Sequence, residues 1–328
     1  MKEIRFYFSV IVIPIGIALN SISFIIFIRK RLNHKSIFGY LYAWQCIFDI
    51  ISLLNELIFT IFEYKDIEVI AHSRFTCKTL YGWVKYVTHL PSFQMILIAL
   101  YFYVSIAYHK ERMLFHKYKL YIVLFMIVFV TLINCVFIIY EKEIMEEIEI
   151  SYFNETINKT LVGYQIKYEC KTEFILDFSL DWINLAMRDF IPFITIFLLN
   201  FLAIRFLFKS KTNVNSKIRK KEFSFIISIF VANFIFLGIY LPWSIVFVIY
   251  HVNHSFYFFP SLIQSHLFEI TATIFGSLAY LNNMTCFFTN IKFNYLFYEE
   301  FFQLLGIKKR VFPTSAGQNS ASVIATET

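Results

Sequence analysis

Seven long apolar segments dominate this chain of 328 residues and constrain its fold more than any other feature. A hydrocarbon core about 30 Å thick needs roughly 20 apolar residues in a helix, because no water is present there to hydrogen-bond an open backbone. The segments therefore predict an all-α membrane protein, a seven-transmembrane helix bundle. They cover about Phe6–Ile28, Ile37–Phe62, Cys77–Tyr108, Leu120–Tyr140, Asp181–Phe208, Phe223–Tyr250 and Phe259–Asn290.

Composition supports a membrane domain rather than a soluble one. Hydrophobic residues make up 58% of the chain and charged residues 16%, against roughly 25% charged in soluble proteins. The net charge of +7 comes from short basic clusters between apolar segments, so nucleic acid is not an expected partner. Residues 1–307 are expected to form one membrane domain, and residues 308–328 a disordered cytoplasmic tail. The first segment is interpreted as its own signal anchor, with a removed signal peptide as the alternative.

Charge and glycosylation signals predict the orientation in the plasma membrane. Four of the loops, 29–35, 110–119, 205–221 and 292–310, hold 19 of the 30 Lys and Arg residues, whereas the stretch 141–181 has a formal charge of −6. Basic loops stay in the cytoplasm. The sequons at Asn154, Asn158 and Asn253 would be modified only outside it. The sequence thus predicts an extracellular N-terminus and a cytoplasmic C-terminus.

Two of the five cysteines lie on the predicted outer face. Cys77 begins the third segment and Cys170 lies in the long acidic loop. A disulfide between them would face the oxidising compartment and would tie the loop over the mouth of the bundle. The alternative is two unpaired thiols.

Single residues at characteristic places in the segments carry a family resemblance. Tyr103 follows the outer cysteine of its segment by 26 residues, and prolines interrupt the fifth and sixth segments at Pro192 and Pro242. With Asn20 and Asp49 in the first two segments, these residues make the chain similar to the rhodopsin-like (class A) G-protein-coupled receptors, especially divergent orphan and peptide-type receptors of invertebrates. The two prolines would act as pivots for switching, or as static kinks.

The chain departs from that family at several switch positions. Phe102 replaces the arginine of the Asp-Arg-Tyr motif, which puts ordinary coupling in doubt. Phe287 and Asn290 replace the proline and tyrosine of the seventh-segment motif, and Tyr240 stands where many members have tryptophan. Aromatic residues at four-residue spacing in Phe293–Phe301 predict a short amphipathic eighth helix.

A carboxylate in mid-membrane is expensive, so Asp49 should face polar partners inside the bundle. The expected partners are Asn20, Asn282 and Asn283. The resemblance implies that such a pocket holds sodium and water, the only cofactor ion expected. The alternative is a structural aspartate that is protonated or bonded to water.

The resemblance implies a cell-surface receptor for a peptide or small cationic ligand, acting through a heterotrimeric G protein and arrestin. Asp177, Asp181 and Glu269 would steer a cation to the outer face, unless the acidic loop is simply solvated. Competing interpretations are a chemosensory (odorant or taste) ion channel, a transporter, and a decoy receptor that does not signal. The sequence contains no arrangement of residues that indicates an enzyme.

Overall fold

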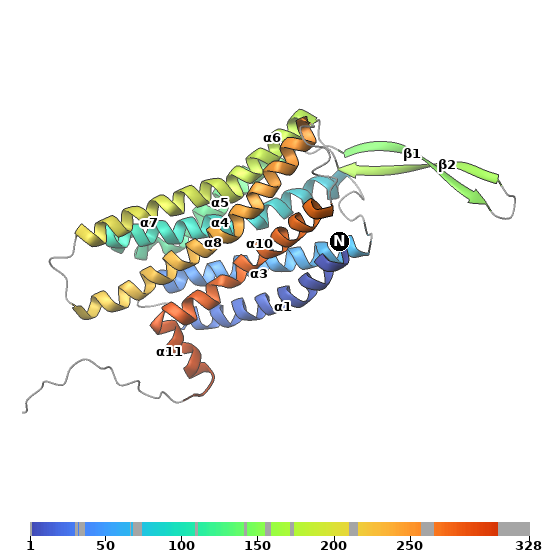
Figure 1. Ribbon diagram of the computed structural model, residues 1–328. Coiled ribbons are helices and arrows are strands. Elements are labelled where there is room, and N and C mark those ends of the chain that lie inside the picture. Colours follow the sequence, from blue (N-terminus) through green and yellow to red (C-terminus); the bar gives the residue numbers. More distant parts are fainter. Residues whose placement is uncertain are drawn as a thin grey trace, which may run out of the picture.

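The computed structural model describes residues 2–29, 32, 37–65, 67, 74–108, 111–140, 143–154, 159–170, 174–209, 216–256 and 266–307. These residues form a bundle of long helices with one β-hairpin projecting from it (Figure 1). The tail predicted at 308–328 lies outside the described residues. The helices of the bundle are α1 (Lys2–Phe27), α3 (Ile37–Tyr64), α4 (Arg74–Ala107), α5 (Glu111–Tyr140), α6 (Phe174–Leu185), α7 (Ile191–Lys209), α8 (Ser216–Phe256) and α10 (His266–Phe293).

Six of the seven predicted segments are confirmed as helices that are long and apolar enough to cross a membrane. The qualifying stretches are Arg5–Phe27, Ile37–Tyr64, Lys78–Ala107, Lys117–Cys135, Trp182–Phe206 and Ile227–Tyr250. This finding is consistent with a multi-pass membrane protein. The seventh segment forms α10, which has 28 residues. It is not among the six, because Ser, Thr and Asn residues interrupt its apolar sequence.

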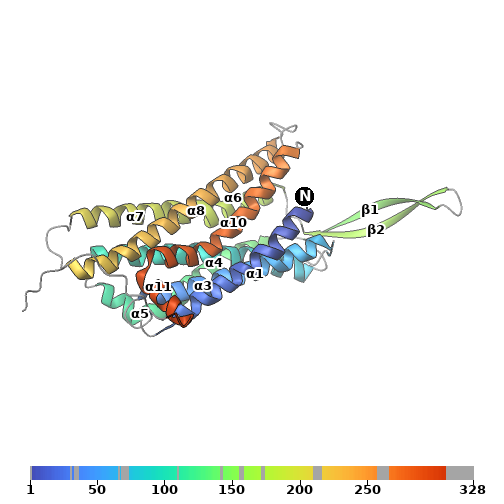
Figure 2. The ribbon, with the colours of Figure 1, turned by 60° about the horizontal axis from the view of Figure 1, so that its bottom comes forward.

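The helices run roughly along one common direction (Figures 1 and 2). Helix α4 packs against α3, α5 and α7, while α10 packs against α8 and α1. Helix α1 also packs against α3, which closes the bundle on that side. We call the end where α1 begins the hairpin end, because the hairpin projects from it in both views, and the opposite end the α11 end.

The hairpin lies within the long acidic segment before α6. Strand β1 (Glu143–Asn154) pairs antiparallel with β2 (Lys159–Cys170), from Glu143 opposite Cys170 to Asn154 opposite Lys159. We expected a solvated loop here. The regular pairing instead joins the backbone N–H and C=O groups that the two strands turn toward each other, while those on the outer edges of both strands face away from the pair.

A short helix, α11 (Tyr295–Leu304), follows α10 at the α11 end and runs at an angle to it (Figure 1). The side chain of Asn294 caps α11 by accepting a hydrogen bond from the N–H of Phe297 at 3.2 Å. The Phe297 ring is fully buried and lies 5.0 Å from the Phe27 ring, between centroids. Arg29 Nη1 contacts Glu300 Oε2 at 3.1 Å. Aromatic packing and one ion pair thus fasten α11 to the end of α1.

Candidate functional site

A cavity of about 300 Å³ lies inside the bundle, toward the hairpin end, and charged and polar side chains form part of its lining. Its lining comes from α1, α3, α4, α8, α10 and a π-helical turn, η2 (Ala186–Phe190), between α6 and α7. We call it the central cavity. It is lined by Arg5, Ser52, Thr88, Pro91, Arg188, Trp243, Ala272, Thr273, Gly276, Ser277, Tyr280 and Asn283. Its volume is near the lower end of small-molecule sites, roughly 300–1,000 Å³.

Arg5 forms one charged wall of the central cavity and joins α1 to α3. Its Nη2 contacts Glu56 Oε1 at 2.9 Å, and its Nη1 contacts Glu63 Oε2 at 2.9 Å. The two glutamates are seven residues apart, which places them on the same face of α3. Glu56 is largely buried and also accepts a hydrogen bond from Thr60 Oγ1 at 3.3 Å. Sequence reasoning missed all three charged residues, although charges at the ends of apolar segments are a usable signal.

The second charged wall is Arg188, in η2. Its Nε donates to Asp189 Oδ1 at 2.9 Å and its Nη2 donates to Asp189 Oδ2 at 3.0 Å. Asp189 is buried, and its Oδ2 also accepts a hydrogen bond from Ser244 Oγ of α8 at 3.3 Å. The carboxylate therefore links the turn between α6 and α7 to α8.

Pro192 gives a local reason for the π-helical turn. Proline has no N–H, so the carbonyl four residues earlier, that of Arg188, cannot be paired as in an α-helix. A wider turn next to the proline is one way for a helix to absorb such a break. Pro192 is buried in the first turn of α7, and Pro242 is half-buried inside α8, two residues before Ser244. The two predicted pivots are thus connected through Asp189.

The residues of the expected sodium pocket lie deep in the bundle. Asn20 Nδ2 donates to the backbone oxygen of Asn283 at 2.6 Å and to that of Gly16 at 3.1 Å, which joins α1 to α10. Asp49 is buried, and its Oδ1 accepts a hydrogen bond from Gln45 Nε2 at 2.9 Å, a partner that we had not expected. Within the described residues, buried side-chain oxygens of Asn20, Gln45 and Asn282 have no hydrogen-bond partner.

Asn290 is a buried connection at the α11 end. Its Nδ2 donates to the Cys286 oxygen at 2.8 Å, and its Oδ1 accepts from Ser228 Oγ at 3.4 Å and from Asn294 Nδ2 at 3.0 Å. It therefore links α8, α10 and the cap of α11. Phe287, at the family's proline position, packs edge-on against the α11 aromatics, with its centroid 5.5 Å from that of Phe301.

Aromatic residues occupy the end of α4, at Tyr101, Phe102 and Tyr103. Phe102 is 3% exposed, and its ring centroid lies 6.2 Å from that of Phe38. Tyr101 also packs edge-on against Phe38, at 4.7 Å. Tyr103 reaches the other way, with its centroid 6.0 Å from that of Phe206 on α7. Aromatic packing therefore connects this end of α4 to α3 and α7.

His89 joins three helices at the side of the bundle. It is fully buried, with Nδ1 3.1 Å from Asn134 Oδ1 of α5 and Nε2 3.0 Å from Asn184 Oδ1 of α6. Asn134 is oriented by its own bond to the Val130 oxygen. A neutral imidazole donates from one ring nitrogen and accepts at the other, so it satisfies both contacts when the Asn184 amide presents its N–H to the ring. We interpret this cluster as structural.

Several sequence-predicted residues have described backbones, while their side chains lie outside the described part. These are Cys77 in α4, Cys170 in β2, Asn154 in β1, Asp177 and Asp181 in α6, Tyr240 and Asn253 in α8, and Glu269 in α10. Asn158 lies entirely outside the described residues. The disulfide, glycosylation and ligand-steering predictions therefore remain predictions. Among the described residues, no group of three or more His, Cys, Asp and Glu side chains is placed to hold a metal ion.

Comparison with known proteins adds no family assignment. No protein-family model matches the chain, and no curated protein matches it either.

Proposed function

We propose that the chain is a rhodopsin-like G-protein-coupled receptor that binds an extracellular ligand in the central cavity. In this proposal α10 is the seventh span, the hairpin end faces the outside, and α11 lies along the inner membrane surface. The observation that carries the proposal is that α10 has buried polar residues both at the cavity, at Asn283, and near the α11 end, at Asn290. Asn283 lines the cavity, its backbone oxygen accepts from Asn20, and Asn290 lies two turns further along α10.

Between the two expected ligand classes, the cavity favours a peptide over a small cation. The charged residues that line it are Arg5 and Arg188. Their carboxylate partners Glu56 and Asp189 are not among the lining residues. A carbonyl-rich or carboxylate-bearing peptide end would find N–H donors on this lining, whereas an ammonium group would find no carboxylate among the lining residues.

The link between Asp189 and Ser244 suggests how binding would reach the inner end. A ligand group that bonds to Arg188 competes with Asp189 for the guanidinium. This competition alters the hydrogen bond that Asp189 accepts from Ser244 of α8. Helix α8 contains Pro242, and the chain beyond a proline kink can swing with a small change in backbone angle. A ligand shifts the equilibrium only as far as it prefers one of the two arrangements.

Sodium fits the donor chemistry of the Asp49 region. Alkali cations prefer oxygen ligands. The four residues offer the Asp49 carboxylate and the amide oxygens of Asn20, Gln45 and Asn282, which have no hydrogen-bond partner among the described residues. We propose that these groups hold the ion. It would supply positive charge beside a buried carboxylate.

The buried position of Phe102 favours a second candidate, a decoy receptor that binds ligand without coupling. Its ring is packed against Phe38, so it offers no charge to a G protein. The family resemblance assigns that contact to an arginine.

One cell assay tests the proposal. The full chain, tagged at both ends, is expressed with promiscuous G-protein and arrestin reporters and is challenged with amidated peptides and monoamines. We expect a peptide response, weakened by Arg188→Gln and retained in Phe125→Leu, a change at an exposed residue of α5. Staining of the C-terminal tag on intact cells would show that the C-terminus lies outside, and it would refute the proposal. A response from Phe102→Arg alone, at equal surface expression, would favour the decoy.

A further inference from the structure

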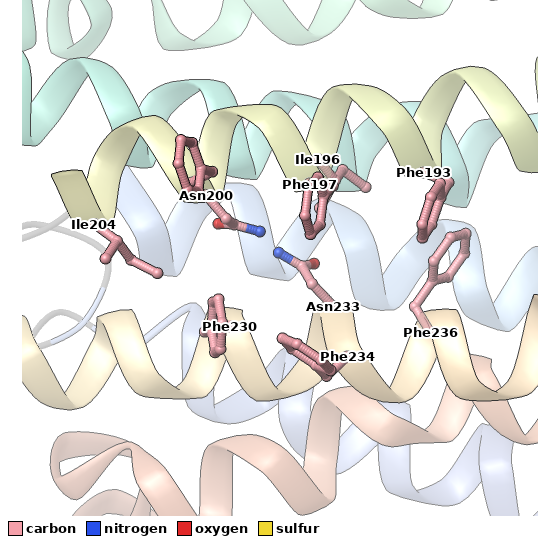
Figure 3. Close-up of a pocket in the computed structure, with 10 residues that line it drawn as sticks. Phe193, Ile196, Phe197, Asn200, Ile204, Phe230, Asn233, Phe234 and Phe236 are labelled. Atoms are coloured by element: carbon pink, nitrogen blue, oxygen red, sulfur yellow. The ribbon is translucent and has the colours of Figure 1, made fainter.

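A second hollow, of about 110 Å³, lies between α7 and α8 and shares no lining residue with the central cavity (Figure 3). Asn200 of α7 and Asn233 of α8 point toward each other across it, with their side-chain nitrogens facing. The oxygen and nitrogen of an amide are assigned from the hydrogen bonds around them, and exchanging them in one of the two residues lets the side chains pair directly. The two amides then satisfy each other, so this hollow requires no ligand.

The central cavity differs, because Glu56 binds two of its lining side chains. The carboxylate of Glu56 accepts a hydrogen bond from Arg5 Nη2 at 2.9 Å and another from the hydroxyl of Tyr280. Of these three described residues, Arg5 and Tyr280 line the cavity and Glu56 does not. One carboxylate of α3 therefore fixes a residue of α1 and a residue of α10 relative to each other.

The hydrogen bond to Glu56 determines what Tyr280 offers to a ligand. A phenol has one hydrogen, and that hydrogen is directed to Glu56, so the Tyr280 oxygen can only accept from a ligand. Arg5 has five N–H groups and no acceptor. It uses one nitrogen for Glu56 and another for Glu63, so N–H groups remain for a ligand. Arg5 and Tyr280 lie close enough to interact electrostatically, and the cavity wall therefore presents donors beside an acceptor.

A primary carboxamide matches this wall better than a carboxylate does. Its carbonyl oxygen accepts from Arg5 while its NH₂ group donates to the Tyr280 oxygen. A carboxylate has no N–H for Tyr280. It would also add negative charge where the Arg5 guanidinium already faces two carboxylates, those of Glu56 and Glu63. A partly buried charge without an opposite partner is unfavourable, so both the hydrogen bonds and the charge favour the amide.

We propose that Glu56 is a positioning residue that makes the central cavity selective for a carboxamide group over a carboxylate. The proposal rests on the proposed function, since it takes the central cavity as the ligand site. It narrows the peptide end to an amidated one, or to an Asn or Gln side chain. Glu56 acts through Tyr280, whose hydroxyl it orients, and through Arg5, whose guanidinium it holds.

The test uses the full-length protein in lipid nanodiscs and three probes that differ in one group, namely N-acetylphenylalanine as its primary amide, its methyl ester and its free acid. Ligand-observed NMR measures binding against empty nanodiscs. We expect the amide to bind about fivefold more tightly than the ester, for about one net hydrogen bond, and the acid to bind no better than the ester. Equal affinities of amide and ester, or tighter binding of the acid, overturn the proposal. Absence of amide binding also overturns it, while a peptide response in the cell assay would leave the receptor assignment standing.

The matched variants are Glu56→Gln and Glu56→Asp, with Phe125→Leu as control. A glutamine can still accept from Arg5, but its NH₂ group donates to the Tyr280 oxygen and turns the hydroxyl toward the ligand. The preference for amide over ester should therefore disappear in Glu56→Gln, a change that a loss of stability alone does not produce. Glu56→Asp keeps a carboxylate and should keep part of the preference. Phe125 is 73% exposed on α5, so its replacement should leave the preference unchanged.

A preference that survives undiminished in Glu56→Gln refutes the role of Glu56. If that variant does not fold, the comparison of amide and ester in the native protein, together with Glu56→Asp, decides the matter.

Discussion

Replacement of Asp189 by asparagine should destabilise the protein far more than the same charge change at Glu63. Asp189 is 4% exposed and receives two guanidinium hydrogen bonds and one from Ser244. An asparagine amide has one acceptor oxygen and one NH₂ group. At least one of the present donors would therefore face an N–H instead of an acceptor. The Arg188 guanidinium would then lose its carboxylate inside a stretch suited to the membrane interior, where charges depend on pairing.

The size of the effect follows from burial. Breaking a buried ion pair costs about 3–5 kcal/mol, and the Arg188 side chain keeps 17% exposure beside the cavity, so we expect about 3 kcal/mol, near the lower limit. At about 2 °C per kcal/mol for a chain of this size, the melting temperature should fall by about 6 °C. The buried thiols of Cys46 and Cys286 allow unfolding to be followed with a thiol-reactive dye.

The control is Glu63→Gln, which removes one carboxylate from Arg5. The Glu63 side chain is 45% exposed, and exposed ion pairs contribute about 0–1 kcal/mol. The melting temperature should therefore fall by no more than about 2 °C. The double variant Arg188→Gln with Asp189→Asn should recover part of the loss, because the guanidinium and the carboxylate are then removed together. Equal falls for Asp189→Asn and Glu63→Gln would refute the view that Asp189 is a desolvated, paired carboxylate.

Three further changes test other parts of the bundle. Asn290→Ala should cost about 1–2 kcal/mol of stability and should speed amide hydrogen exchange in α11, since its cap loses a partner. A methyl group on Gly276 would lie 3.1 Å from Trp243 Cζ3, so Gly276→Ala should push the indole into the central cavity and weaken peptide binding in a ligand-displacement assay. Phe102→Ala should lower the free energy of unfolding by about 2 kcal/mol, because in a bilayer the variant loses packing contacts but no transfer free energy from water. The control Phe288→Ala, at a residue 56% exposed, should leave the melting temperature almost unchanged.

Segment hydropathy predicted most helices but not where they end. The requirement that every backbone group in hydrocarbon be paired leaves helix as the solution for 20 apolar residues. The length of an apolar segment matches the thickness of the hydrocarbon core, however, and a helix can continue beyond that core. Helix α5 begins at Glu111 rather than near Leu120, and α8 runs from Ser216 to Phe256 rather than from Phe223 to Tyr250.

The hairpin was missed because its segment was interpreted from its charge. Glu143, Glu147 and Glu149 suggested a solvated run, yet Ile144, Ile148 and Ile150 follow them directly. Alternation of polar and β-branched residues is a strand signal. Net charge alone does not distinguish a solvated loop from an exposed hairpin.

The polar groups of the site were only partly predictable. Asp49 and Asn20 stood out because polar groups in apolar segments are costly, but which partner each would meet depends on helix rotation and packing. Asp49 bonds to Gln45 on its own helix, one turn away. Asp189 was not predicted, although the adjacent Arg188 and Asp189 in an apolar segment have a physical reason to pair.

The two prolines illustrate why the site depends on more than matched motif positions. Pro192 and Pro242 could each be a static kink if the helices that carry them moved separately. Asp189 lies in the π-helical turn that precedes Pro192, and its carboxylate accepts from Ser244 just beyond Pro242. A shift in either helix therefore lengthens a hydrogen bond to the other. The same carboxylate is held by Arg188, which lines the cavity, so a ligand that draws the guanidinium away would act on both prolines at once.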